Sequence, residues 1–548
     1  MRITAFTIAA SVCLCFPAAA GTSPPVTEPA VRAGANSDIQ ARVIALGKPG
    51  GRSISGARIA SFDFLPKLYE SMGYQRLWTN PANITALKEA VRRSWEDGLL
   101  PTDFHGKAVA DFSDPAVNDA NSADRDIILS DAFVRLLYQL YFGKVSPNGL
   151  DPNWNFARPA LSGDPVKIIS SAIAEGAAGN LVEKAKLAHP IYQSLKAMLQ
   201  AYTHYSDTGG WPQLPPGPAV KPGASDVRIP ILRQRLAVTG EYQDNGNASS
   251  EILDEKLTEA LRKFQKSHGL EAEGNLGPQT QAELNVPVQT RIEQIRVNLE
   301  RGRWILRTIG DEFVAVNVAG FYLRVVLEGK PVWGTRVIVG QTYHKTPIFT
   351  EAMKSIVFNP DWTVPRSIVR NEMFAKASAD PGYLAANNYT LTSTSGAVDP
   401  ATIDWTQWTA ATFPYGVVQR PGPKNALGLV KFLFPNKYSV YLHDTPGRGL
   451  FGKSGRTFSH GCIRVEDPMK LAEIILGNRL GWDRSKIDSI VAAGKLYQVN
   501  LPKPLPVLLL YWTVDPQFDG SAYFYQDIYG RDARLLKALN TEFSPATR

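Results

Sequence analysis

The hydrophobic residues between about positions 41 and 205 recur at spacings of three and four, which predicts amphipathic helices. The stretch 127–142 is hydrophobic almost all round, so we expect a buried helix there. Gly98 and Pro101, in Asp97-Gly98-Leu99-Leu100-Pro101, are placed to end the helix that precedes them. No catalytic constellation stands out in this sequence range, and we interpret residues 41–205 as a helical scaffold domain.

A proline-rich stretch, residues 206–227, follows this domain. Its run Trp211-Pro212-Gln213-Leu214-Pro215-Pro216-Gly217-Pro218 predicts a stiff linker. Residues 228–287 then carry two apolar stripes and a glycine-rich turn into a third helical segment. The stripes are Ile231, Leu232 and Leu236, and then Leu257, Leu261 and Phe264. This pattern predicts a small module of three helices.

A connecting helix is predicted at 288–310, and from residue 311 the hydrophobic period shortens to that of β-strands. Glu328-Gly329-Lys330 has the composition of a hairpin turn. We expect a mostly-β domain over 311–500, and an extension, 501–548, that completes its sheet. The predicted strands include 313–318, 322–327, 335–339, 355–358, 429–434 and 439–443.

Residues 373–413 interrupt the strand pattern. They lack alternation and are rich in Ala, Asn, Thr and Trp, over a length that is unusual for a connection. We therefore predict an inserted lid or cap near the active site.

The N-terminus has the pattern of a secretory signal peptide over residues 1–20. Arg2 precedes an apolar run that is too short to span a bilayer, and small residues at Ala18 and Ala20 suit cleavage before Gly21. Residues 21–40, rich in Pro, Ser, Thr, Ala and Gly, predict a flexible leader. The protein is therefore expected to be exported.

The net charge of the chain limits the kinds of molecule that we expect it to bind. The formal net charge is +8 and is spread along the chain rather than concentrated in one run. Nucleic acid is a poor partner for an exported protein of this kind, so we expect none. An acidic polymer such as the bacterial cell wall fits better.

Cysteine usage points to one reactive thiol. The chain has 3 cysteines, and two of them, Cys13 and Cys15, lie in the predicted signal peptide. Cleavage leaves Cys462 as the sole cysteine of an exported protein, so no intramolecular disulfide is possible. We favour a catalytic thiol over a buried, inert one.

The residues around Cys462 supply the other groups that a cysteine nucleophile needs. His443 ends a predicted strand, and the glycine-rich loop 444–458 allows the chain to return so that imidazole and sulfur face each other. Gly461 permits a tight turn, which makes the amides around Gly461 and Cys462 candidates for the oxyanion hole.

Three alternatives compete with these roles. His443, His460, Asp444 and Cys462 are possible metal ligands, but His-x-Cys is not a usual zinc spacing and no second cysteine is at hand, so we predict no metal and no cofactor. His460 by itself suits a structural role. For Arg464, an ion pair with Glu466 or Asp467 and the binding of a substrate carboxylate both remain open.

The three-helix module resembles a peptidoglycan-binding domain. The resemblance rests on Leu232-Arg233-Gln234-Arg235-Leu236, on Phe264-Gln265-Lys266, and on Gly269-Leu270 with Gly274 to Leu284. It implies this fold over about sixty residues. Whether the module binds glycan or only packs against its neighbours remains open.

Ser459-His460-Gly461-Cys462, with His443 upstream, resembles the signature of L,D-transpeptidases of the YkuD type. Further matches to the large periplasmic branch are Val339-Gly340, Lys345-Thr346-Pro347, Asn359 to Pro365, Gly422 to Gly428, Phe434-Pro435-Asn436, Asp97-Gly98-Leu99 and Asp527-Ile528-Tyr529-Gly530. The implied fold is multidomain α+β: a helical scaffold, a three-helix peptidoglycan-binding module and a mostly-β catalytic domain with an inserted lid. The implied location is the periplasm of a Gram-negative bacterium, in association with the cell wall.

The resemblance also implies roles for single residues. Cys462 is the expected nucleophile and His443 the base, with Asp444 or a backbone group orienting the imidazole. Tyr441 and His460 are expected in the pocket wall, and Trp362 is a further substrate-binding candidate. A role for Arg464 is less direct, because some members carry Asn shortly after the cysteine.

The implied reaction is a transfer between two stem peptides of peptidoglycan. A donor tetrapeptide acylates Cys462 with loss of D-alanine, and an acceptor amine resolves the thioester into a 3–3 cross-link. Inhibitors of the carbapenem type are expected to acylate the same sulfur. Hydrolysis by the same machinery, as in an L,D-carboxypeptidase or a peptidase that releases wall protein, and a decayed wall-binding protein are the alternatives. Oligomeric state and protein partners are not predicted.

Overall fold

A computed structural model describes residues 31–543, apart from 49, 114–120, 151–153, 157–158, 244–245, 381 and 518–520. The predicted signal peptide and the predicted leader as far as residue 30 lie outside the described residues. From residue 31 the segment predicted as a flexible leader is helical, because helix α1 spans Val31–Leu46. Its residues Ile39, Val43 and Leu46 are fully buried, and packing against the scaffold explains why the helix forms despite a weakly amphipathic sequence.

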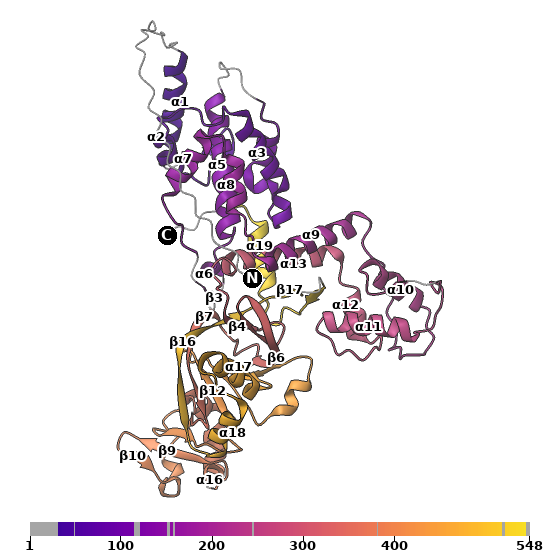
Figure 1. Cartoon of the computed structure of the whole chain (residues 1–548), viewed down its shortest axis with the longest axis vertical. Helices are drawn as coiled ribbons and strands as arrows, with labels where there is room; N and C mark the ends of the chain where they lie inside the picture. The colour runs from indigo at the N-terminus through magenta and orange to yellow at the C-terminus, as the bar shows by residue number, and fades with distance from the viewer. Residues whose placement is uncertain are drawn as a thin grey trace, which may run out of the picture.

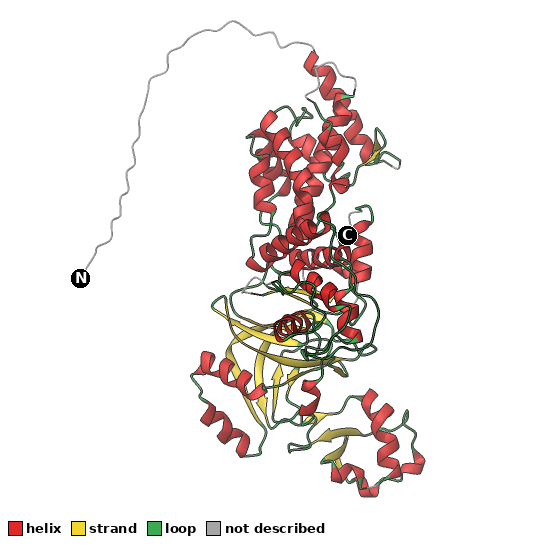
Figure 2. Ribbon diagram, turned by 90° about the vertical axis from the view of Figure 1, so that its right-hand side faces the viewer, coloured by secondary structure: helices red, strands yellow, loops and turns green. Residues whose placement is uncertain are grey.

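The helical scaffold lies at one end of the molecule and the strands below it (Figures 1 and 2). One hydrophobic core joins α1 to the helical segments that follow it, up to α8. The longest helix, α5 (Ser122–Phe142), runs through this core and buries the stretch that the sequence predicted to be buried. The main other helices are α2 (Leu65–Ser71), α3 (Pro81–Arg92), α4 (Gly106–Ala110), α7 (Pro165–Ala174) and α8 (Ala178–Ala185).

The three-helix module projects to one side (Figure 1) and consists of α10 (Ile229–Val238), α11 (Glu255–Ser267) and α12 (Pro278–Leu284). Its core also takes in residues from the proline-rich stretch. Leu214 is buried there, and Val220 forms a β-bridge to Leu276. The stretch predicted as a linker is therefore partly packed onto the module, because its few apolar side chains find a buried place.

Two helices join the scaffold to the catalytic domain. α9 (Pro190–Asp207) packs on α13 (Val288–Ile305), which occupies the segment predicted as a connecting helix. α13 is buried along nearly its whole length, and its charged residues Glu300 and Arg303 are fully buried. It is thus a central helix of the molecule rather than an exposed connection.

The catalytic domain is a sheet that closes on itself. Its strand order is β12-β13-β15-β6-β5-β4-β16-β7, and β12 also pairs with β7. The strands are β4 (Phe313–Asn317), β5 (Tyr322–Leu327), β6 (Lys330–Gly340), β7 (Ile348–Phe358), β12 (Val430–Leu433), β13 (Leu442–His443), β15 (Ile463–Val465) and β16 (Tyr497–Leu510). Short strands β3 (Trp154–Asn155) and β14 (Thr457–Ser459) add to it at β7 and β6.

The predicted hairpin between β5 and β6 is confirmed. Glu328 and Gly329 both have positive φ, +52° and +70°, as a tight two-residue turn requires. After the active-site strands come α17 (Pro468–Leu480) and α18 (Arg484–Ala492), and the last described helix is α19 (Asp532–Asn540). Strand β16 lies between β4 and β7, so the segment that follows residue 500 does help to complete the sheet.

The inserted segment is larger and more ordered than predicted. It contains a four-stranded sheet, β10-β9-β11-β8, made of β8 (Trp362–Thr363), β9 (Tyr389–Ser393), β10 (Gly396–Val398) and β11 (Gly416–Gln419). The boundaries 373–413 were therefore too narrow, and strands do occur inside them. These strands are short, and they are stabilised by a separate core around Leu391, Phe413 and Val417. The insertion lies at the end of the molecule opposite the scaffold (Figure 1).

None of the described helices has the length and apolar character that crossing a membrane requires.

Candidate active site

The strands that carry the predicted base and nucleophile lie side by side. β13 and β15 pair in parallel, with Leu442 opposite Ile463 and His443 opposite Arg464. Side chains alternate along a strand, and Leu442 and Ile463 are fully buried in the core. The neighbouring side chains therefore face away from that core, which places four predicted site residues on one face of the sheet: Tyr441, His443, Cys462 and Arg464.

His443 is oriented by the backbone rather than by a carboxylate. Its Nδ1 lies 2.5 Å from the carbonyl oxygen of Asp444, so Nδ1–H donates to that oxygen and Nε2 is left to accept a proton. The Asp444 carboxylate is engaged elsewhere: it accepts from the Leu429 N–H at 2.9 Å and from the Arg448 guanidinium at 2.6 Å. Of the two possibilities that the sequence left open, the geometry supports the backbone carbonyl.

The protonation state of the pair follows from its surroundings. Burial, and then the Arg464 cation, lower the pKa of His443 to about 3. Burial raises the pKa of the partly exposed Cys462, against the opposing effect of hydrogen bonds from Tyr441 and of the cations Arg464 and Lys431. At neutral pH the site thus holds a protonated thiol and a neutral imidazole on one face of the sheet, and the thiol donates to the Ser439 carbonyl oxygen at 3.8 Å.

Tyr441 lies beside the sulfur, and Trp362 contacts Tyr441. The backbone N–H and the hydroxyl of Tyr441 both favour the Cys462 thiolate, and Trp362 hydrogen bonds to the Tyr441 side chain. The Tyr441 ring and the His443 imidazole have centroids 5.6 Å apart. Because Trp362 belongs to β8, the insertion contributes directly to the wall of the site.

The turn before Cys462 is built from glycine and serine. Gly461 has a φ of +114°, in the region that favours glycine. Its N–H donates to Ser459 Oγ at 3.1 Å, and that hydroxyl donates to the Cys462 carbonyl at 2.5 Å. The Gly461 amide is therefore engaged, which corrects its assignment to the oxyanion hole. The Cys462 N–H has no acceptor within the described part of the chain, so it remains the candidate donor.

A second set of hydrogen bonds fixes this turn from behind, and the sequence did not assign it. Thr346 Oγ1 donates to the Gly461 carbonyl at 3.0 Å, and the Tyr529 hydroxyl donates to the Gly340 carbonyl at 2.6 Å. The Thr346 N–H donates to the Tyr529 hydroxyl at 3.2 Å. Two short motifs that entered only as family matches, Lys345-Thr346-Pro347 and Asp527 to Gly530, thus meet under the cysteine turn. Because the two motifs lie far apart in the sequence, the sequence alone did not predict this contact.

His460 contacts the insertion. Its Nε2 lies 2.7 Å from Glu372 Oε1, and its ring lies 5.1 Å from that of His344. Glu372 belongs to the short helix η3 (Val369–Met373) of the insertion. His460 therefore joins the cysteine turn to the insertion.

Arg464 does not form the ion pair that was one of its two alternatives. Glu466 pairs with Arg336, and Asp467 accepts from the N–H of Lys470 at the start of α17. Arg464 Nε is buried and has no hydrogen-bond acceptor among the described residues. The guanidinium thus remains available to an anionic group on the face that carries Cys462.

Lys431 also belongs to the candidate site, and the sequence analysis did not predict it. β12 pairs with β13 so that Lys431 lies opposite His443, and the Lys431 ammonium lies 5.4 Å from the centre of the Tyr441 ring. The signal in the sequence was a single charged residue within the apolar strand Val430–Leu433. Two cations, Lys431 and Arg464, therefore flank His443 in neighbouring strands.

No group of three or more potential metal ligands occurs among the described residues. The arrangement offers a thiol, a neutral imidazole, a backbone N–H donor and two nearby cations, the groups that nucleophilic attack by a cysteine would need.

Comparison with known families divides the chain in the same way as its folded parts. Residues 311–489 match the family model described as "L,D-transpeptidase catalytic domain". Residues 63–199 match a model described as "Scaffold domain", and residues 225–284 match one described as "Putative peptidoglycan binding domain". The recognised fold, a helical scaffold with a peptidoglycan-binding domain and a mostly-β catalytic domain, is confirmed.

A relative from Haemophilus influenzae, named "Putative L,D-transpeptidase", is 35% identical over 246 residues, which are 44% of this chain and 49% of that protein. The match thus spans about half the length of the relative. Two crystal structures of L,D-transpeptidases were also found. The one from Xylanimonas cellulosilytica has 16% identity and a TM-score of 0.18, and covers 54% of this chain and 99% of that chain. The one from Stackebrandtia nassauensis has 14% identity and a TM-score of 0.21, and the match covers 55% of this chain and 96% of that chain.

Proposed function

We propose that this protein, whose residues 311–489 match the model of an L,D-transpeptidase catalytic domain, forms 3–3 cross-links between the stem peptides of peptidoglycan. The observation that carries the proposal is the parallel pairing of β13 and β15, which sets Cys462 and His443 on one face. The neighbouring peptidoglycan-binding domain supports peptidoglycan as the substrate.

The first step is acylation of the enzyme. Cys462 Sγ attacks the carbonyl carbon that joins the L-centre of meso-diaminopimelate to the terminal D-alanine of the donor tetrapeptide. His443 Nε2 takes the thiol proton as the C–S bond forms, and the Cys462 N–H stabilises the oxyanion. The C–N bond then breaks, D-alanine leaves with the proton from His443, and a thioester remains.

The second step returns the thiol. The side-chain amine of an acceptor diaminopimelate attacks the thioester carbonyl, and His443 removes a proton from that amine. The C–S bond breaks as the new amide forms, and the sulfur recovers a proton from His443. The insertion borders the site through Trp362 and Glu372, where it can limit access of water and so favour the amine over hydrolysis.

The cations flanking His443 suit this substrate. A stem peptide carries several carboxylates, and Arg464 and Lys431 both face the position where it would bind. We further propose that the protein is exported to the periplasm, where peptidoglycan is available, and that carbapenems acylate Cys462.

Purified protein incubated with disaccharide-tetrapeptide provides the test. Mass spectrometry is expected to show D-alanine release together with a cross-linked dimer, and Cys462→Ala is expected to give neither. If the protein releases tripeptide but forms no cross-linked dimer, its function would be that of an L,D-carboxypeptidase and not of a transferase. Absence of both products, and of a carbapenem adduct on Cys462, would favour a decayed wall-binding protein.

A further inference from the structure

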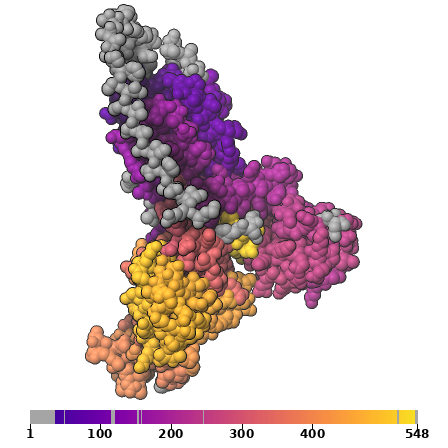
Figure 3. All heavy atoms as spheres, viewed as in Figure 1, coloured from indigo at the N-terminus to yellow at the C-terminus, as the bar shows by residue number. Residues whose placement is uncertain are grey.

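A cleft of about 1020 Å³ separates the three-helix module from the catalytic barrel. The space-filling view shows the open angle between the two lobes (Figure 3). One wall is the end of α11 with the turn that follows it, from Lys266 to Glu271. The other wall is formed by β5, by residues 334–336 of β6 and by the loop 452–457. None of the catalytic residues described above lines it.

The cleft is rich in positive charge. Five cations line it, against the carboxylates of Glu271 and Glu466; the cations are Lys266, Arg324, Arg336, Lys453 and Arg456. Arg336 pairs with Glu466, and Arg324 pairs with Asp515 at 2.9 Å. The exposed ammonium groups of Lys266 and Lys453, one on each wall, have no partner among the described residues. The cleft therefore keeps a positive excess that suits an anionic ligand.

Aromatic rings form part of the barrel wall. Tyr322, Tyr523 and Tyr525 line the cleft, and the rings of Tyr322 and Tyr525 have centroids 6.0 Å apart. Tyrosine offers an apolar face and a polar edge, which is the combination that a sugar ring with its hydroxyl groups requires. Cations together with aromatic rings favour a ligand that is both saccharide and anion.

The cleft is connected to the active site through the chain itself. The loop 452–457 that lines it runs directly into β14 (Thr457–Ser459), and the turn to Cys462 follows. Thr342, another lining residue, lies between β6 and Thr346, whose hydroxyl holds Gly461. A ligand lying in the cleft is thus bound by the same segments that position the nucleophile.

We propose that this cleft binds a polymeric peptidoglycan strand, whose stem-peptide and lactyl carboxylates meet Lys266 and Lys453 while its sugar rings lie against the tyrosines. This inference rests on the proposed function for the nature of the substrate. It extends that function by assigning a second substrate site, shared between the module and the barrel, to a surface outside the catalytic face.

Strand binding by the full chain tests the cleft, with Cys462→Ala as the background so that no turnover interferes. Fluorescence anisotropy with labelled, uncross-linked peptidoglycan strands gives the affinity. The pair Lys266→Glu and Lys453→Glu, made together, is expected to lower the affinity about tenfold, and more at low salt than at high salt. The matched control is Lys263→Glu with Lys495→Glu, two exposed lysines outside the cleft. It carries the same change in net charge and is expected to alter the affinity less than about twofold.

Thermal melting of all variants confirms that each is folded. If the cleft variant binds the strands as tightly as Cys462→Ala does, the cleft is not the binding site. The same conclusion follows if the control pair of substitutions lowers the affinity as much as the cleft pair does. Equally tight, cleft-dependent binding of polyglutamate would overturn peptidoglycan as its specific ligand. Dimer formation from disaccharide-tetrapeptide by the unsubstituted chain is measured in parallel. Its absence would count against the proposed function, whereas the binding data alone decide whether the cleft holds a strand.

Discussion

At the scale of single residues, the proposed catalytic pair, Cys462 and His443, rests in its neutral form. His443 is a base whose pKa burial and Arg464 lower to about 3, and burial raises the pKa of the Cys462 thiol. A pre-formed thiolate–imidazolium pair would need the opposite shifts. In the proposed reaction, proton transfer would therefore accompany the attack on the carbonyl, and Tyr441, Lys431 and Arg464 would lower its cost by favouring the thiolate.

The thiol is accordingly expected to react with iodoacetamide at a rate that rises with pH up to a midpoint above that of an ordinary cysteine. Lys431→Met should move this midpoint further upward, because a cation that favours the thiolate is lost, and should lower reactivity at pH 7 about threefold or more. Lys354→Met, an exposed lysine on β7, is the matched control and should leave the profile unchanged. A midpoint below pH 7 in the unsubstituted protein would contradict the neutral pair.

The orienting group of His443 allows a second prediction. Since Nδ1–H donates to a backbone carbonyl, Asp444→Asn should keep the imidazole in place and lower the acylation rate less than about tenfold. His443→Gln removes the base and should lower it by about 10²–10⁴. Stopped-flow acylation by a carbapenem measures both rates, with melting temperatures as the control for folding. Equal losses in the two variants would assign the orienting role to the carboxylate.

At the scale of elements, the sequence predicted those parts of the site that lie close together along the chain. The strand ending at His443 and the glycine turn at Cys462 were both visible as patterns. Lys431, Thr346 and Tyr529 were not assigned, because each reaches the site through pairing or packing between segments far apart in sequence. The strands of the insertion were not predicted for another reason. They are short and half-exposed, so the alternation of apolar and polar residues along them is weak.

The contact between the module and the end of the chain predicts a dependence on pH. His268 follows α11 and is stacked between Phe264, at 3.9 Å, and Phe524 of β18 (Ala522–Phe524), at 5.4 Å. Burial, with the Arg291 cation, lowers its pKa well below the ordinary value of 6.5. The folded protein therefore keeps His268 neutral while the unfolded chain takes up a proton below about pH 6.5, so stability is present above that pH and is lost as pH falls.

Melting temperatures measured between pH 7.5 and 5 check this expectation. His268→Phe keeps an aromatic ring in the stack and removes the titration, so its melting temperature should fall less over this range. His204→Phe, on the helix α9, replaces a more exposed histidine and should leave the pH dependence as it is. An unchanged slope in His268→Phe would assign the acid sensitivity to other groups.

At the scale of the whole molecule, α13 holds the scaffold, the barrel and the C-terminal segment together. On the scaffold side, Arg296 donates to the carbonyl of Gly98 at 3.0 Å. Gly98 has a φ of +73°, which favours glycine, and a Cβ there would crowd Leu299 at 3.2 Å, so a larger residue would be strained here. The matched motif Asp97-Gly98-Leu99 is thus a docking point for the helix.

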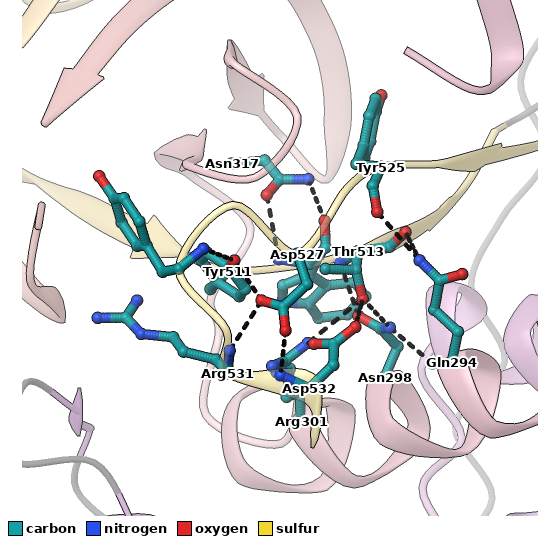
Figure 4. Close-up of polar contacts among 12 residues, drawn as sticks. Gln294, Asn298, Arg301, Asn317, Tyr511, Thr513, Tyr525, Asp527, Arg531 and Asp532 are labelled. Carbon is teal, nitrogen blue, oxygen red and sulfur yellow. Dashed lines mark hydrogen bonds and ion pairs between the residues drawn. The ribbon is translucent and has the colours of Figure 1, made fainter. Parts of the chain in front are cut away.

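On the other side, α13 meets a polar cluster at the end of the barrel (Figure 4). Asn298 exchanges hydrogen bonds with Thr513, and Arg301 forms an ion pair with Asp532 at 2.7 Å. Asp527 accepts from the Tyr511 hydroxyl at 2.6 Å and from the Asp532 N–H at 2.8 Å, which fixes the start of α19. The same segment carries Tyr529, so the position of α13 is linked to the support beneath the cysteine turn.

The fully buried pair Glu300–Arg303 is the part of α13 on which this assembly should depend most. Glu300 accepts from Arg303 at 2.6 Å and from the N–H of Val145, and Arg303 donates to the Asp97 carbonyl and to the Tyr192 hydroxyl. Glu300→Gln leaves the arginine charge buried without its counter-charge, which should lower the free energy of unfolding by about 3–5 kcal/mol. Glu293→Gln makes the same change at a partly exposed position of the helix and should cost less than about 1 kcal/mol.

Calorimetry distinguishes a loss of stability of the whole assembly from a loss confined to the surroundings of Glu300. Because the pair binds scaffold groups from within a helix that also holds the barrel, Glu300→Gln should lower the melting temperature of the scaffold and separate its transition from that of the catalytic domain. Formation of the cross-linked peptide below the first transition should persist, because the pair contacts Val145, Asp97 and Tyr192 and none of the residues of the candidate active site. A single transition at the original temperature would show that the two domains are held together by contacts other than this pair.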